Sequence, residues 1–212
     1  DANYRDLIQS MWENEKESVS ESCTALDDVA YTDRCLRRLV ALYQKCGTVL
    51  RKFEKVHGWL LEKSHALRTK RNQPMSTVAP LKSLSRIIEK LSFKPKYRNN
   101  ACHVRDIVRG SLIYETLEHM IKLLELLQQE NFGPNTVAVV GIKNGLEAPK
   151  EKTDMGWRDI KVYLNIDGIV CELQIIHIDM YTCRKNLDRH AAYVNTRTHD
   201  ELRAYFQDKL SI

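Results

Sequence analysis

The sequence has no run of about 20 apolar residues, the length that a membrane-spanning helix needs, and its N-terminus lacks the segments of a signal peptide. It is also poor in residues that break regular structure, with eight glycines and five prolines among 212 residues. We therefore expect an ordered, intracellular and cytoplasmic protein without a membrane span. Because the chain begins with Asp1 rather than Met, we expect an excised domain or a processed product, with any targeting segment outside it.

The cysteines show no metal-binding pattern. They form no CxxC pair, and Cys102 with His103, the nearest approach to a zinc-finger pair, has no second pair at a suitable distance. We expect reduced thiols and no structural metal. The six cysteines are Cys23, Cys35, Cys46, Cys102, Cys171 and Cys183.

Common catalytic signatures are missing as well, including the GxGxxG and GxxxxGK[ST] phosphate loops, GxSxG and HExxH. Positive charge is concentrated instead. Residues 76–110 contain eight Lys or Arg and two acids, whereas the whole chain has a net charge of +5. Such a segment suits a polyphosphate ligand or nucleic acid, and it equally suits a solvated helix face. Few aromatic residues lie between these cations, which disfavours direct nucleic-acid binding.

Helical periodicity runs through the N-terminal third. From Leu36 to Leu67 apolar residues recur every three or four positions, in a heptad-type seam that includes His57 and Ser64. Gly47 and Gly58 interrupt it at a cost of about 1 kcal/mol each, so we expect a break into two helices. The seam indicates either core packing or a surface for a protein partner.

Residues 71–80 contain two prolines and end the helical pattern. We place the boundary there. Residues 1–75 form a helical N-terminal segment, in which residues 4–21 are a further, more polar helix. Residues 76–212 form the second domain.

In the second domain, helix and strand patterns are mixed. The predicted elements are a helix over 81–91, a strand over 107–114, a helix over 117–127, a buried strand over 136–140, strands over 160–166 and 169–175, and a helix from 178. This order predicts an α+β fold, with a small mixed or antiparallel sheet of four to five strands flanked by helices.

Asp167-Gly168 predicts a two-residue hairpin loop, and the loop fixes a register. One face of the hairpin is then apolar, with Ile166 opposite Ile169, Leu164 opposite Cys171, Val162 opposite Leu173 and Ile160 opposite Ile175. The other face is polar and pairs Tyr163 with Glu172 and Lys161 with Gln174, with Asp159 near the same surface. We expect a functional groove over the polar face.

The last helix is predicted to bury one stripe, formed by Met180, Cys183, Leu187, Ala191 and Val194. Cys171 is likewise expected to pack in the core. A second face of the same helix presents His190, Tyr193 and Arg197, which could close over a nucleotide or pack on the N-terminal helices.

Two acids stand out among the cations. Asp106 precedes the first strand and Glu172 lies within a later one. Carboxylates on neighbouring strands can hold Mg²⁺, while Lys and Arg neutralise the charge that develops in phosphoryl or pyrophosphoryl transfer. Acids at strand starts and on solvated strand faces are also often structural, so the residues alone leave both roles open.

Ordered motifs give these residues a context: KSLSRIIEK (82–90), RDIVRGSLIY (105–114), IKNG (142–145), GWRDIKVYL (156–164) and CELQI (171–175). Together with the spaced His190, Tyr193 and Arg197, they resemble the RelA/SpoT (p)ppGpp synthetase domain, in particular its divergent branch with DxxRG and GYRD. The resemblance covers about residues 76–197. It implies a nucleotidyltransferase-like fold and Mg²⁺-dependent transfer of pyrophosphate from ATP to the 3′-hydroxyl of a guanine nucleotide.

The resemblance also implies roles for individual residues. Asp106 matches the magnesium-binding aspartate, and Glu172 matches the catalytic glutamate and a second magnesium ligand. Trp157 stands where the family has a tyrosine that stacks on the acceptor guanine. The implied nucleotide-binding residues are Lys82, Arg86, Lys90, Arg109, Lys143, Trp157, Arg158, Lys161 and Gln174, of which the first three match a basic helix that holds the ATP phosphates.

Two departures from the family keep other functions open. The family's GYxSLH reads GWRDIK here, with Lys161 in place of the histidine, and its DxxGxR reads DIVRGS, with the arginine at Arg109. One alternative is a toxin-like relative that modifies an adenine nucleotide or the tRNA 3′ end, for which Lys161 would accommodate RNA. The other is a catalytically silent fold that serves as a binding or scaffold module through its N-terminal helices.

Overall fold

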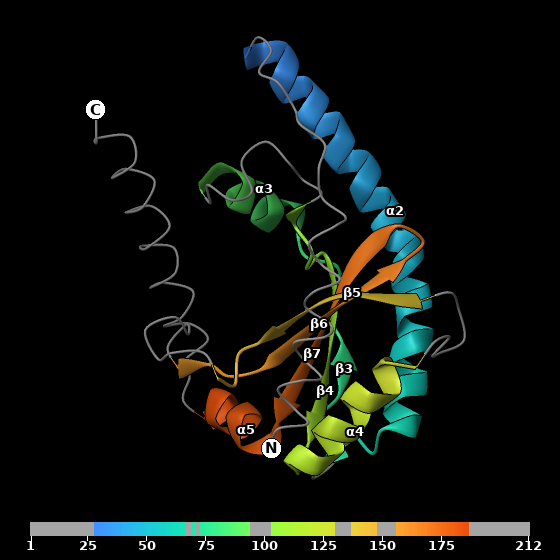
Figure 1. Ribbon diagram of the computed structural model, residues 1–212. Coiled ribbons are helices and arrows are strands. Elements are labelled where there is room, and N and C mark those ends of the chain that lie inside the picture. Colours follow the sequence, from blue (N-terminus) through green and yellow to red (C-terminus); the bar gives the residue numbers. More distant parts are fainter. Residues whose placement is uncertain are drawn as a thin grey trace.

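The computed structural model describes residues 28–66, 69–70, 73–93, 103–129, 137–147 and 156–186 (Figure 1). The predicted helix over 4–21 lies outside these residues. So do Leu187, Ala191 and Val194 of the predicted buried stripe, and His190, Tyr193 and Arg197.

A five-stranded mixed sheet with the order β3-β4-β7-β6-β5 forms the centre of the molecule. Only β4 and β7 are parallel; the other neighbours are antiparallel. The strands are β3 (Thr77–Val78), β4 (Val108–Tyr114), β5 (Val137–Asn144), β6 (Ile160–Ile166) and β7 (Ile169–His177). The described helices are α2 (Asp28–Lys63), α3 (Leu84–Phe93), α4 (Leu117–Leu127) and α5 (Ile178–Asn186), and β1 (Thr69–Lys70) pairs with β2 (Gln73–Pro74) in a separate small sheet. The predicted α+β class is confirmed.

The two faces of the sheet are covered differently. In Figure 1, α2 and α4 lie along one face, α5 lies against the other, and α3 stands beside the beginning of β4. The α2 and α4 side encloses the main apolar core, to which α4 contributes Met120, Leu123, Leu124 and Leu127. No helix in the described part of the chain is long and apolar enough to cross a membrane.

The β6–β7 hairpin has the register predicted from Asp167-Gly168, from Ile166 opposite Ile169 to Ile160 opposite Ile175. Both loop residues have positive φ, 53° at Asp167 and 76° at Gly168, as a tight hairpin turn of this type requires. The polar face therefore carries Glu172 opposite Tyr163, as expected.

Strand β5 differs from the prediction. A short, buried strand over 136–140 was expected, but β5 continues to Asn144, and Ala138 and Lys143 are exposed. It is the edge strand of the sheet and pairs with β6 alone, with a bulge between Val139 and Gly141. An edge position leaves part of a strand open to water, which apolar periodicity over five residues does not reveal.

Helix α2 is continuous over 36 residues, so the predicted break at Gly47 and Gly58 is wrong. Burial of the seam against the sheet outweighs the low helix propensity of the two glycines. The seam forms core, with Leu39, Cys46, Val49, Phe53, Val56 and Leu60 all buried. Its polar members are paired: His57 Nε2 donates to the Ser111 carbonyl (3.0 Å), and the Ser64 and Tyr114 hydroxyls are 2.6 Å apart.

The prediction for Cys183 is also wrong, because this side chain is exposed, whereas Cys171 is buried as expected. Helix α5 instead contributes Ile178, Met180 and Tyr181 to a small apolar cluster on the sheet face opposite α2 and α4. The other members of this cluster are Met75, Ile113, Ile176 and Trp157. The contact side of α5 is thus set by Ile178 and Tyr181, which the predicted stripe did not include.

Gly110 allows α2 to approach β4 closely. A Cβ at this position would lie 3.0 Å from the Phe53 ring, 3.2 Å from the His57 ring and 3.2 Å from the Thr77 carbonyl, whereas a Cβ at Gly47 would meet nothing within 4 Å. We expect Gly110→Ala to lower the free energy of unfolding by about 1 to 3 kcal/mol through overpacking. Gly47→Ala, the matched control, should raise it by up to about 1 kcal/mol. Urea unfolding of both variants tests the contact, and equal effects would contradict it.

His57 should make stability depend on pH. Burial lowers the pKa of its imidazole, and the hydrogen bond to Ser111 only partly opposes this. The unfolded chain, in which the pKa of His57 is about 6.5, therefore binds the proton more strongly. Its contribution to stability is present above that pH and is lost as the pH falls below it. We expect His57→Gln to flatten the loss of stability between about pH 7 and 5, measured as urea midpoints; an unchanged slope would contradict this.

Candidate functional site

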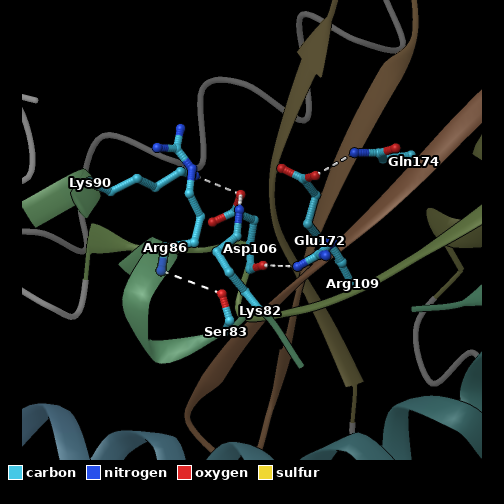
Figure 2. A network of polar contacts seen from close by, with 8 residues as sticks. All are labelled: Lys82, Ser83, Arg86, Lys90, Asp106, Arg109, Glu172 and Gln174. Carbon is cyan, nitrogen blue, oxygen red and sulfur yellow. Dashed lines mark hydrogen bonds and ion pairs between the residues drawn. The ribbon is translucent and has the colours of Figure 1, made fainter. Parts of the chain in front are cut away.

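Two lysines converge on one carboxylate oxygen at the start of β4 (Figure 2). Lys82 Nζ lies 2.5 Å and Lys90 Nζ 2.7 Å from Asp106 Oδ2. Lys82 is held beside Asp106 by its backbone, since its amide donates to the Ile107 carbonyl at 3.0 Å. Lys90 reaches the same oxygen from the last turn of α3. The structure thus brings together three residues that were predicted to lie in one site.

All three side chains are mostly withdrawn from water, with 12% of Lys82, 10% of Lys90 and 18% of Asp106 exposed. Burial lowers the pKa of Lys82 to about 8, with Lys90 and Arg109 adding repulsion and Asp106 opposing both. Burial alone would raise the pKa of Asp106, but Lys90 and Lys82 outweigh it and hold that pKa at about 2. The carboxyl group is therefore ionised and holds two cations at neutral pH.

The second oxygen of the same carboxylate is different. Asp106 Oδ1 is buried and has no hydrogen-bond partner among the described residues. An unsatisfied buried oxygen of an ionised group is costly, so this atom is suited to accept a metal ion or a donor from a ligand.

Glu172 lies in the middle of β7, where the parallel register places it beside Arg109 of β4. Glu172 is buried, with 7% of its surface exposed, and Gln174 Nε2 donates to its Oε1 at 2.7 Å. Arg109 Nη1 donates to the Asp106 backbone carbonyl at 3.3 Å (Figure 2).

Burial raises the pKa of Glu172, and the negative charges of Asp106 and Asp159 raise it further. The hydrogen bond from Gln174 and the charge of Lys161 act in the opposite direction without cancelling the rise. Asp106 and Glu172 thus have pKa values shifted in opposite directions, a separation typical of carboxylates with different roles.

Helix α3 is positioned by Ser83, whose Oγ accepts a hydrogen bond from the Arg86 amide at 3.4 Å (Figure 2). Capping of this kind fixes the start of a helix and with it the direction of its side chains. Arg86 pairs with Glu89 at 2.5 Å. The basic helix predicted from sequence therefore brings Lys90 to Asp106, with Lys82 just before it and Arg86 paired beside it.

The other predicted binding residues lie toward β5 and β6. Lys143 and Lys161 are cross-strand neighbours, and Lys161 Nζ donates to Asp159 Oδ1 at 3.0 Å. The Arg158 guanidinium donates to the Leu146 carbonyl and so fastens the segment after β5. The ring of Trp157 belongs to the small apolar cluster below α5.

Sequence reasoning left Asp159 out of the predicted site, although it noted that this residue lies near the polar surface. Asp159 is 3% exposed, and its Oδ2 has no partner among the described residues. Its carbonyl accepts from the Gly145 amide at 2.8 Å, and a Cβ on Gly145 would come within 2.5 Å of that carbonyl. The sequence places Asp159 between Arg158 and the strand that begins at Ile160, and this position could have marked it as a candidate. Its burial could not be predicted, because it depends on the contact with Gly145, which is distant in sequence.

The acidic side chains at this site offer oxygen atoms as metal ligands. In the described ranges no group of three or more His, Cys, Asp or Glu side chains is arranged to hold a metal ion. Two carboxylates, Asp106 and Glu172, remain as candidate ligands. This pair fits Mg²⁺, which keeps several waters and uses one or two carboxylates together with substrate phosphates.

No protein-family model and no curated protein matches the sequence. Solved structures do match. The small alarmone synthetase 1 from Bacillus subtilis, bound to its product pppGpp, has a TM-score of 0.50 and 17% identity over 82% of this chain and 90% of that one. A GTP pyrophosphokinase family protein from Streptococcus pneumoniae has a TM-score of 0.47 and 14% identity over 85% and 90%.

The Type VI effector Tas1, solved with its immunity protein, also matches, with a TM-score of 0.48 and 19% identity over 68% of this chain and 63% of that one. The alarmone synthetase comparison shows that this chain has the RelA/SpoT-like synthetase fold. The resemblance drawn from the sequence motifs is confirmed for the fold.

Removing the charge of Asp106 should lower the free energy of unfolding far more than removing the charge of an acid in a surface ion pair. Asp106→Asn removes the negative charge that two mostly buried ammonium groups both contact, and we expect it to lower the free energy of unfolding by about 3 to 5 kcal/mol. Asp167→Asn is the matched control, because Asp167 pairs with Lys52 at the surface and Asn accepts its positive φ. It should cost at most about 1 kcal/mol.

Urea unfolding at neutral pH measures both variants. Because the pKa of Asp106 is lowered to about 2, its stabilisation is present above the usual value of about 4 and is lost as the pH falls through 2. Similar losses in the two variants would show that the lysine pair does not depend on Asp106.

Proposed function

We propose that this protein transfers pyrophosphate from ATP to the 3′-hydroxyl of a guanine nucleotide, with Mg²⁺ held by Asp106 and Glu172. One observation carries the proposal: an ionised aspartate that holds two lysines lies near a buried glutamate whose pKa is raised. This combination supplies cations for phosphates and a carboxylate with increased proton affinity in one place. The RelA/SpoT-like synthetase fold supports the same chemistry by analogy.

On the ATP side, the cations around Asp106 would hold the phosphates. Lys82 and Lys90 contact the carboxylate of Asp106, and Arg109 contacts its backbone carbonyl, so three cationic side chains lie beside one carboxylate. Arg86 follows on the same side of α3. Cations fixed in this way stabilise the charge that develops on a phosphoryl group during transfer.

The chemistry of the carboxylates fits Mg²⁺. Asp106 Oδ1 is a buried acceptor without a partner among the described residues, and Glu172 lies close enough to Asp106 for that charge to raise the pKa of Glu172. Asp106 and Glu172 would hold the ion, and its charge would offset part of the negative charge of the ATP phosphates.

Glu172 would act as the base. Its raised pKa favours acceptance of a proton from the 3′-hydroxyl, and the hydrogen bond from Gln174 orients the carboxylate. The hydroxyl oxygen then bonds to the β-phosphorus of ATP while the bond from that phosphorus to the α–β bridging oxygen breaks. AMP leaves with the electron pair, and the β- and γ-phosphoryl groups remain on the acceptor.

On the acceptor side, Trp157 would stack on the base, while Lys143 and Lys161 would contact the acceptor's phosphates. Arg158 would contribute by fixing the segment between β5 and β6, since its guanidinium holds the Leu146 carbonyl. The lysine at position 161 favours a second candidate acceptor, an adenine nucleotide or a tRNA 3′ end. A protein partner would have to use surfaces of α2 other than its apolar seam, because the sheet covers that seam.

The test is transfer of label from γ-labelled ATP in the presence of Mg²⁺, with GDP, GTP, ATP or tRNA as acceptor and chromatography of the products. We expect a labelled guanine nucleotide, and a loss of at least about 100-fold in Glu172→Gln because general-base catalysis is removed. Glu54→Gln, on the exposed side of α2, is the matched control and should retain full activity.

Each outcome separates the candidates. A product with ATP or tRNA alone would establish the alternative acceptor. Undiminished transfer by folded Glu172→Gln would rule out its role as the base. No product in any reaction would contradict the proposed function and favour a binding or scaffold module.

A further inference from the structure

Arg184, in the last turn of α5, places its guanidinium over the ring of Trp157, with Cζ 4.8 Å from the ring centroid. The two residues are distant in sequence, and the function proposed above gives no role to Arg184. Its side chain is exposed, and among the described residues no carboxylate is paired with it. The indole ring is therefore its partner in this part of the chain.

The ring is held in place by its other neighbours. Trp157 packs against a cluster of buried residues that consists of Met75, Ile113 of β4, Ile176 of β7 and Ile178 of α5. The apolar contacts fix the position of the indole, and the exposed guanidinium lies over one face of the ring. A nucleobase that stacks on that face must therefore meet Arg184.

The distance between Arg184 and the ring of Trp157 decides whether a base can fit between them. A base inserted between the indole and the guanidinium would need about 7 Å, two layers of van der Waals contact, whereas Cζ is already within 4.8 Å of the centroid. Arg184 thus occupies the layer that a stacked base would fill. An exposed cation–π contact is weaker than stacking of a base on an aromatic ring, so the base can displace it.

We propose that Arg184 covers the stacking surface of Trp157 in the nucleotide-free protein and is displaced by the acceptor purine, so that it lowers the affinity for that purine. The inference rests on the proposed function, because it takes the acceptor base to stack on Trp157. It assigns to α5 a residue that tunes acceptor affinity without contacting the reacting atoms. Such a residue weakens binding of a nucleotide only where the base enters the stack.

Binding is measured by calorimetry with the full chain, using GDP as the purine ligand and tripolyphosphate as a ligand without a base. Arg184→Ala should bind GDP about two- to fivefold more tightly, the range expected when an exposed cation–π contact no longer has to be broken. Tripolyphosphate should not gain affinity. Arg51→Ala, which removes an exposed cation from α2, is the matched control and should leave both affinities unchanged.

A double-mutant cycle locates the effect. In a Trp157→Ala background, Arg184→Ala should no longer change GDP affinity, because the covered surface is gone. Weaker or unchanged GDP binding in Arg184→Ala would overturn the proposal, as would an equal gain for tripolyphosphate or absence of GDP binding in both proteins. The transfer assay on the protein with Glu172 intact separates this inference from the proposed function, since an Arg184 effect on GDP affinity without any transfer would contradict only the chemistry.

Discussion

Strand β4 runs parallel to β7, and the site depends on this pairing. The register sets Arg109 beside Glu172 and Ser111 beside Gln174, so the chain that follows Asp106 is brought to the strand that carries the second acid. Alternate residues of β4 serve the other face, where Gly110 lies against α2. A shift of one residue would turn Glu172 toward the apolar core, so packing of α2 also secures the polar face.

The site contains charges that stability alone does not explain. Lys82, Lys90 and Asp106 are mostly buried, and an apolar cluster of the same volume could be as stable. Asp106 Oδ1 and Asp159 Oδ2, which have no partner in the part of the chain that the structure describes, add to the free-energy cost of the arrangement. One face of the sheet carries concentrated charge whose hydrogen bonds are incomplete, and the other face carries an apolar core. This pattern is expected where ligand binding, rather than folding, determines which residues occupy the charged face.

Features set by neighbouring residues could be predicted from the sequence. Asp167-Gly168 fixed the hairpin register through local turn geometry, and the spacing of apolar residues located α4. Features set across the fold could not be predicted. Continuity of α2 through Gly47 depends on the sheet beneath it, and the contact between Arg184 and Trp157 depends on where α5 packs. Asp106 and Glu172 stand out in the sequence as acids near many cations, but local patterns leave their roles open, and only the ordered motifs link the two segments in one site.

The lysines around Asp106 have already lost most of their water when the protein is folded. Dehydration of an ammonium group is normally a large part of the free-energy cost of binding an anion. Here that cost belongs to folding, and the lysines are held in place by a carboxylate until an anion arrives. An incoming phosphate would exchange one oxygen partner for another instead of stripping water from a flexible side chain, so the cation cluster is preorganised for rapid, reversible exchange of anions.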